Sequence, residues 1–177
     1  MTTFGIITTY RIGAALAGFC SAVACAQADT AGFVAFSPEQ IKWTMSAAIP
    51  PGGQSAIVYG DPRKPAPYIT RVKQPADYKI PPHSHPDERV YTVISGTFYI
   101  GFGEKFDPAK LKAFAAGSTF VVPAKASHYH WMRSGEAVVQ ISGIGPSGID
   151  YVDHADDPRQ TTHDNGTIVM VPPSKSH

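Results

Sequence analysis

Short β-type runs separated by turn-forming residues constrain the fold of this chain more than any other feature. The chain contains 16 glycines and 16 prolines, which are unfavourable inside helices and typical of turns. Runs of aliphatic, aromatic and β-branched residues lie between them. The expected strands span 41–44, 56–59, 68–73, 78–80, 89–94, 97–102, 119–122, 128–132, 137–141, 149–152 and 167–171. This spacing favours an all-β sandwich or barrel.

Two connections between the expected strands carry local signals of their own. Ser95-Gly96 lies between two runs and is typical of a tight hairpin turn. Asp107 followed by Pro108 is typical of the start of a helix, and helix-compatible residues continue to Phe114. We therefore expect one short helix that connects two β blocks.

The first 28 residues have the pattern of a secretory signal peptide. Arg11, the only basic residue there, precedes an apolar run of small residues, and Ala26-Gln27-Ala28 offers a cleavage site. The run of about fifteen residues is shorter than the ~20 needed to span a bilayer. We predict a signal peptide over 1–28 and one domain over 29–177 that is periplasmic or secreted, with no stable membrane span. A retained anchor helix is the alternative.

Composition excludes several classes of function. Cleavage after Ala28 would remove Cys20 and Cys25, the two cysteines of the chain, and with them disulfide and thiol chemistry. Lys and Arg number 15 against 14 Asp and Glu, which gives no electrostatic reason to expect nucleic acid as a partner. No phosphate-binding loop or paired catalytic carboxylates stand out.

Four histidines form two pairs, each with one intervening residue: His83 with His85, and His128 with His130. Alternate residues of an extended segment point to the same face, so each pair presents both imidazoles to one side. Neutral imidazole is a common ligand for transition metals. We predict that His83, His85 and His128 bind a divalent Fe, Mn, Zn, Ni or Cu ion. The alternative is that they are buried polar residues with structural roles only.

The first histidine pair resembles the first sequence motif of the cupin superfamily, whose members are small β-barrels that commonly hold a metal. That motif reads glycine, five residues, His-x-His, three or four residues, glutamate, six residues, glycine. His83, His85 and Gly96 match it, while Asp77 stands at the opening glycine position and Arg89 at the glutamate position.

The second histidine pair resembles the second cupin motif: glycine, five residues, Pro-x-Gly, two residues, His, three residues, asparagine. Three positions match, namely Gly117, Pro123 and His128, whereas Lys125 replaces the glycine and Met132 the asparagine. The resemblance implies a cupin-type β-barrel or jelly-roll.

Arg89 at the glutamate position leaves three interpretations open. A guanidinium is always protonated and cannot bind a metal itself. A β-bulge would turn Glu88 inward and restore a carboxylate ligand. Alternatively, Arg89 faces the cavity and binds an anionic ligand through its bidentate fork. The third interpretation pairs Arg89 with Asp87 or another acid near the end of the barrel.

Four further side chains are candidates for the site. His130 shares the face of His128 and is a candidate fourth ligand, general base or orienting partner, and Glu88 is the other candidate proton carrier. Tyr91 and Gln140 are candidate ligand-binding residues. A packed core position for Tyr91 and an outward position for Gln140 are the alternatives.

These residues predict an exported metal-binding protein with a cavity for a small, anionic molecule. The cupin resemblance implies a metal-dependent dioxygenase or isomerase. The alternative is a non-catalytic anion-binding module with a structural metal or none. A homodimer is a further option, because barrels with exposed edge strands often pair.

Overall fold

The computed structural model describes residues 32–162 and 168–169, so the predicted signal peptide lies outside the described residues. The chain divides into two units, Met1–Ala35 and Phe36–His177. The described residues of the first unit, 32–35, form no helix or strand. Within the described ranges no helix is long and apolar enough to cross a membrane.

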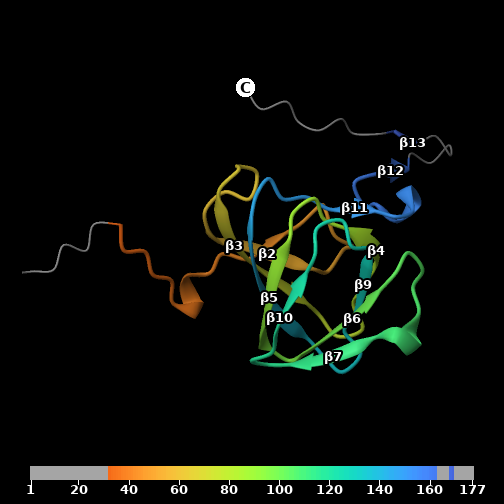
Figure 1. The fold of residues 1–177 in the computed structure, drawn as a ribbon, viewed down its shortest axis with the longest axis horizontal. Helices are drawn as coiled ribbons and strands as arrows, with labels where there is room; N and C mark the ends of the chain where they lie inside the picture. The colour runs from red at the N-terminus through yellow and green to blue at the C-terminus, as the bar shows by residue number, and fades with distance from the viewer. Residues whose placement is uncertain (1–31, 163–167, 170–177) are drawn as a thin grey trace, which may run out of the picture. The chain divides into compact units, whose positions relative to one another are not determined.

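The second unit contains two large antiparallel sheets (Figure 1). The first sheet has the order β1 (Thr44–Met45), β2 (Gln54–Tyr59), β3 (Pro67–Gln74), β10 (Ala137–Ile144), β5 (Arg89–Ser95), β8 (Thr119–Val122). The second has the order β11 (Asp150–Tyr151), β4 (Lys79–Ser84), β9 (His128–Trp131), β6 (Thr97–Phe102), β7 (Lys112–Ala115). A small separate ladder pairs β12 (Thr161–Thr162) with β13 (Ile168–Val169). The all-β prediction is confirmed.

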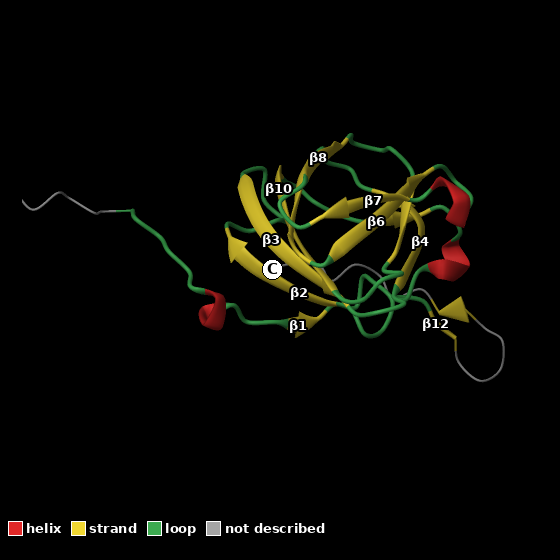
Figure 2. Ribbon diagram, turned by 90° about the horizontal axis from the view of Figure 1, so that it is seen from below, coloured by secondary structure: helices red, strands yellow, loops and turns green. Residues whose placement is uncertain are grey.

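The chain crosses repeatedly between the two large sheets, which is the connectivity of a jelly-roll. From β3 to β6 each successive strand belongs to the other sheet, and the same holds from β7 to β11. Figure 2 shows the sheets as facing walls, with β2, β3 and β10 on one side and β4, β6 and β7 on the other. The space between them holds both the core and the site.

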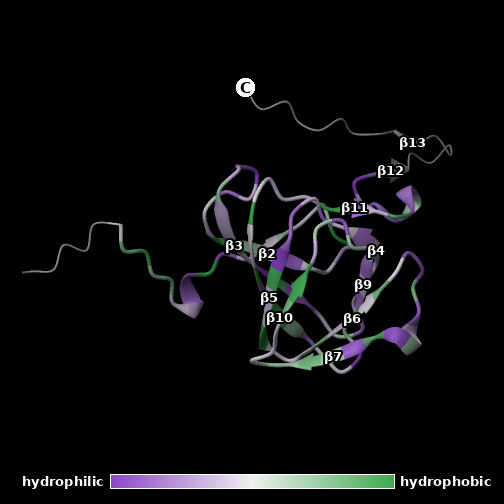
Figure 3. Ribbon diagram, in the orientation of Figure 1, coloured by the Kyte–Doolittle hydropathy of each residue, from purple (hydrophilic) through white to green (hydrophobic). Residues whose placement is uncertain are grey.

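The core consists of aromatic and aliphatic side chains that alternate along the strands. Tyr91, Phe98 and Val139 are each at most 1% exposed, and burial of such a side chain stabilises the fold by about 1.5–3 kcal/mol. The Tyr91 ring stacks on Phe120 with centroids 5.3 Å apart. Hydrophobic residues concentrate on β5 and β10, whereas β4 and β9 are more hydrophilic because they carry the histidines (Figure 3).

The predicted hairpin at Ser95-Gly96 is wrong. β5 and β6 lie in different sheets, so the chain crosses between sheets here instead of folding back on itself. Gly96 has φ +74, and a Cβ at this position would lie 2.1 Å from the backbone oxygen of Glu136. The glycine is therefore required for a crossover and not for a hairpin.

The predicted connecting helix is reduced to one 3₁₀ turn, η2 (Pro108–Lys110). Its cap is as expected, because the Asp107 carboxylate accepts a hydrogen bond from the backbone nitrogen of Ala109 at 3.0 Å. The chain after it forms β7, in which Phe114 lies opposite Phe98 of β6. Packing of Phe114 against the core stabilises a strand here in preference to a helix.

Two residues that stand at motif glycine positions adopt the backbone conformation that glycine favours. Asp77 has φ +60 and Lys125 has φ +63. The backbone nitrogen of Lys125 donates to the carbonyl of His85 at 2.7 Å, and that of Asp77 donates to the carbonyl of Met132 at 2.8 Å. These turns are therefore formed without the glycines.

Candidate metal centre

Three predicted ligands meet at the junction of β4 and β9. His83 and His128 lie directly opposite each other on the paired strands, and His85 comes just after β4 ends. One ring nitrogen from each lies within 4.8 Å of the other two. All three side chains are buried, with His85 the most exposed at 4%.

A β-bulge in β4 turns His83 inward. Ile80 pairs with His130 and His83 with His128, so β4 carries one residue more than β9 over this interval. The extra residue falls at Pro81 and Pro82, which have no backbone N–H to contribute to the ladder. Strict alternation would place Ile80 and His83 on opposite faces, whereas here both line the cavity.

Backbone carbonyls fix the orientation of all three imidazoles. The Nδ1 atoms of His83, His85 and His128 lie 2.8, 2.7 and 2.9 Å from carbonyl oxygens of Pro81, Gly148 and Ala126. A carbonyl only accepts, so each Nδ1 carries the proton and each Nε2 presents its lone pair. Outer contacts of this kind prepare an imidazole to bind a metal.

The donor set fits a transition-metal ion. The Nε2 atom of His128 is buried and has no hydrogen-bond partner among the described residues, which is unfavourable unless another group is bound there. Burial lowers the pKa of His83 to about 3 and that of His128 to about 4. Burial also lowers the pKa of His85. The imidazoles are therefore neutral at pH 7, as ligation requires.

His130 lies beside this cluster and contacts a residue that the sequence did not reveal, Gln74 of β3. The amide nitrogen of Gln74 lies 3.3 Å from Nδ1 of His130. Gln74 Oε1 and His130 Nε2 are both buried without a partner among the described residues. An amide that presented its oxygen to Nδ1 would leave Nε2 of His130 with a free lone pair, as in His128. The only signal in the sequence was the alternation of Thr70, Val72 and Gln74.

Arg89 forms a buried ion pair with Asp87 and anchors a loop. Its Nη2 atom lies 3.1 Å from the Asp87 carboxylate and donates to Ser147 Oγ at 2.6 Å and to the Gly148 carbonyl at 2.7 Å. Asp87 also accepts from the Tyr68 hydroxyl. The Gly148 carbonyl is the same one that orients His85. Arg89 therefore supports the candidate metal ligand His85 from the position where the motif has glutamate.

Two of the other sequence candidates lie away from the centre, and the third lies beside it. Glu88 is exposed and does not line the cavity, and the register shift in β5 lies at the other end of the strand, between Val93 and Ser95. Gln140 accepts from Arg71 Nε at 3.1 Å on the outer face of the sheet. Tyr91 lines the cavity, and its hydroxyl lies 3.3 Å from Nε2 of His85.

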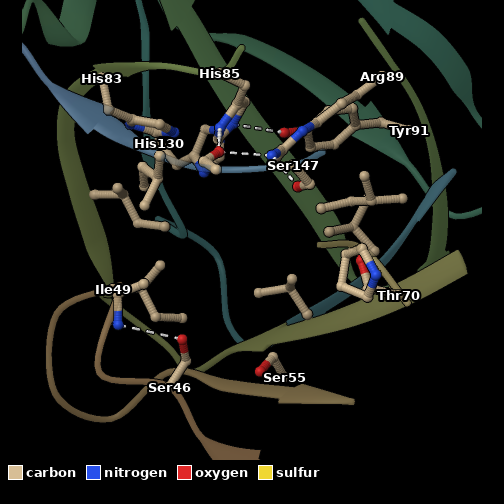
Figure 4. A pocket seen from close by; sticks show the side chains of 18 of the residues that line it. Ser46, Ile49, Ser55, Thr70, His83, His85, Arg89, Tyr91, His130 and Ser147 are labelled. Carbon is tan, nitrogen blue, oxygen red and sulfur yellow. Dashed lines mark hydrogen bonds between the residues drawn. The ribbon is translucent and has the colours of Figure 1, made fainter. Parts of the chain in front are cut away.

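A cavity of about 310 Å³ extends from the histidines between the two sheets. Figure 4 shows His83, His85, Arg89, Tyr91 and Ser147 at one end and Ser46 and Ser55 at the other. The wall between these ends is aliphatic. It is formed by Ala48, Ile49, Val72, Ile80, Val139, Ile141 and Ile149.

Comparisons with known proteins agree on one fold. Residues 71–142 match the family model described as Cupin domain. The polyketide cyclase RemF from Streptomyces resistomycificus superposes with a TM-score of 0.59 at 13% identity, over 71% of this chain and 89% of that one. This match establishes similarity of fold alone. A search of curated proteins found no match.

Two smaller superpositions cover most of the other protein but less of this chain. KdgF from Halomonas sp. gives a TM-score of 0.49 at 20% identity, over 62% of this chain and 92% of that one. An RmlC-like cupin from Shewanella frigidimarina gives 0.49 at 16% identity, over 62% and 89%.

Proposed function

We propose that this chain, a cupin by the match of residues 71–142 to the Cupin domain model, is a metal-dependent enzyme acting on a small molecule held between its two sheets. One observation carries the proposal. The Nε2 atoms of His83, His85 and His128 converge at one end of the cavity, and each Nδ1 is bonded to a backbone carbonyl. Three protein ligands leave coordination positions for a substrate.

The proposed chemistry is that of a dioxygenase or an isomerase. A bound ion of this class supplies Lewis acidity or activates O₂. The aliphatic wall excludes water from the reacting group, and Tyr91 and Arg89 border the same end of the cavity. His130 is the proposed proton carrier if it does not act as a fourth ligand, because its Nε2 atom has no other partner among the described residues.

A non-catalytic binding module is the second candidate, and one observation favours it. None of the described residues that line the cavity is Asp or Glu. No carboxylate is thus in place to act as a general acid or base, and Glu88 is exposed. In this alternative the metal, if bound, anchors the ligand only.

Metal analysis of the purified protein tests the proposal. After reconstitution with Zn²⁺, Mn²⁺ or Fe²⁺ and removal of excess ion, we expect about one ion per chain, as the three-histidine ligand set implies. A His83→Ala/His128→Ala double variant should retain none. The matched control is His154→Ala, since His154 is exposed in a short 3₁₀ turn. Substoichiometric metal in the wild-type protein would refute the proposal.

Export remains part of the proposal and has its own test. Expression of the full chain in a bacterial host with a secretion pathway should give a mature protein that begins at Asp29, after the Ala-Gln-Ala site. N-terminal sequencing of the exported fraction measures this directly. A chain that still begins at Met1 would contradict it.

A further inference from the structure

We infer that the cavity takes a monocarboxylate with an apolar body of roughly ten to fifteen non-hydrogen atoms, a size scaled from the ~150 Å³ cavity that holds benzene. The inference rests on the proposed metal site and specifies the class of molecule that binds beside it. Charge, wall chemistry and volume support it separately.

The charges that border the cavity favour an anion. Its charged lining residues are Arg63, Arg89 and Arg159, and no carboxylate is among the described lining residues. Each arginine is paired with an aspartate two residues before it in the chain, at 2.9, 3.1 and 2.7 Å. These aspartates do not line the cavity, so an ammonium group bound there would meet no opposite charge.

The histidine end of the cavity, where the metal ion would bind, strengthens the preference for an anionic ligand. Each of the three converging imidazoles donates Nδ1–H to a backbone carbonyl, so each would bind the ion as a neutral ligand through Nε2. Arg89 and Asp87 neutralise each other and add no negative charge. The charge of a divalent ion would therefore remain uncompensated in a water-poor environment, where electrostatic attraction is strong. A carboxylate on the ligand supplies the negative charge that a glutamate ligand would otherwise provide.

The aliphatic wall of the cavity determines the chemistry of the rest of the ligand. Val72 of β3 and Val139 of β10 lie opposite each other in the sheet and both face the cavity. Ile49, Ile141 and Ile149 extend this aliphatic surface. Apolar groups bind such surfaces by leaving water, whereas polar groups lose hydrogen bonds there. The body of the ligand is therefore apolar.

The volume limits the length of that body. A cavity of about 310 Å³ is roughly twice the ~150 Å³ that accommodates benzene in a dry protein interior. An aromatic ring joined to a short chain and a carboxylate fills this space. The hydroxyls of Ser46, Ser55 and Thr70 line the end away from the histidines, so one distal polar substituent would also find partners.

Isothermal titration calorimetry with 4-phenylbutyrate on Zn²⁺-loaded protein tests the inference. We expect binding at least tenfold tighter than that of 4-phenyl-1-butanol or butyrate, and no binding of 4-phenylbutylamine. Val72→Phe, which narrows the cavity, should lower the affinity for 4-phenylbutyrate at least tenfold and leave the zinc content unchanged. Val138→Phe is the matched control, because Val138 does not line the cavity.

The outcomes separate this inference from the proposed function. If zinc binds but the alcohol or the amine binds as tightly as the carboxylate, the inference is wrong and the metal site stands. If the carboxylate binds equally well to metal-free protein, its anchoring at the metal is likewise refuted. If no zinc binds in the metal analysis, the proposed function fails first and the inference fails with it.

Discussion

Lys125 adopts a conformation that costs an ordinary residue free energy. With φ +63 it lies in the left-handed region, where the Cβ atom of an L-residue meets the backbone at a cost of roughly 1–2 kcal/mol. The hydrogen bond from its backbone nitrogen to the carbonyl of His85 holds it there. The turn next to the proposed metal ligand His85 is therefore maintained against a local preference.

Lys125→Gly should raise the free energy of unfolding by about 1 kcal/mol, since the strain is removed and only part of the gain is lost to the more flexible unfolded chain. Urea unfolding of the metal-free protein measures the change. Lys105→Gly is the control, because Lys105 is exposed and has no positive φ. An unchanged or lowered stability in Lys125→Gly would show that the turn is unstrained.

Residue spacing predicted that the histidines cluster, because the side-chain direction along a strand depends only on neighbouring residues. His83 and His85, like His128 and His130, share a face through the period of two along an extended chain. The role of Arg89 was not predictable in the same way. Its partners Ser147 and Gly148 lie 58 and 59 residues further along the chain, and Gln74 lies 56 residues before His130. Only the tertiary fold brings such pairs together.

At the scale of elements, sequence patterns located strands better than they assigned them to sheets. The run 119–122 coincides with β8, and most other strands differ from expectation by a few residues at their ends. The Ser95-Gly96 signal correctly marked a change of direction but not the change of sheet. The helix-compatible run after Asp107 was too short to form a helix against the pairing of β7 with β6.

The contact between β5 and the loop after β10 leads to a prediction about metal affinity. Because Arg89 anchors the loop whose carbonyl orients His85, an Asp87→Asn/Arg89→Gln double variant should bind Zn²⁺ about 10–100-fold more weakly. The double change avoids leaving Asp87 buried without its partner, which alone costs about 3–5 kcal/mol. Competition with a chromophoric chelator measures the affinity.

Arg71→Gln is the matched control for this variant, because Arg71 pairs with Gln140 on the outer face of the same sheet. Its zinc affinity should equal that of the wild-type protein. Equal affinities in all three proteins would show that the loop does not position His85. Circular dichroism of each protein verifies that the sheets are retained.

At the scale of the whole molecule, buried neutral histidines make stability depend on pH. Burial holds the pKa of His83 at about 3 and that of His128 at about 4, below the ordinary value of 6.5. Between about pH 6.5 and 4 the unfolded chain therefore binds more protons than the folded one, and acidification favours unfolding.

We expect the metal-free protein to lose stability as the pH falls from 7 to 4, by up to ~1.4 kcal/mol per pH unit for each such histidine. Urea unfolding midpoints at four pH values measure how steeply the free energy of unfolding depends on pH. His83→Gln should reduce this dependence, whereas His154→Ala, on an exposed turn, should not. A flat profile in the wild-type protein would mean that the histidines are already protonated or accessible to water.

The carbonyl of Gly148 serves two hydrogen-bond donors at once, Nδ1 of His85 and Nη2 of Arg89. The residues on either side of it, Ser147 and Ile149, also line the cavity. A molecule that displaces this loop would therefore shift the orientation of His85, the proposed metal ligand. Thermodynamic reciprocity then requires that occupancy of the cavity change metal affinity by the same factor by which the metal changes affinity for the molecule. Binding of a molecule in the cavity and binding of the proposed metal ion would thus be coupled through the carbonyl group of Gly148.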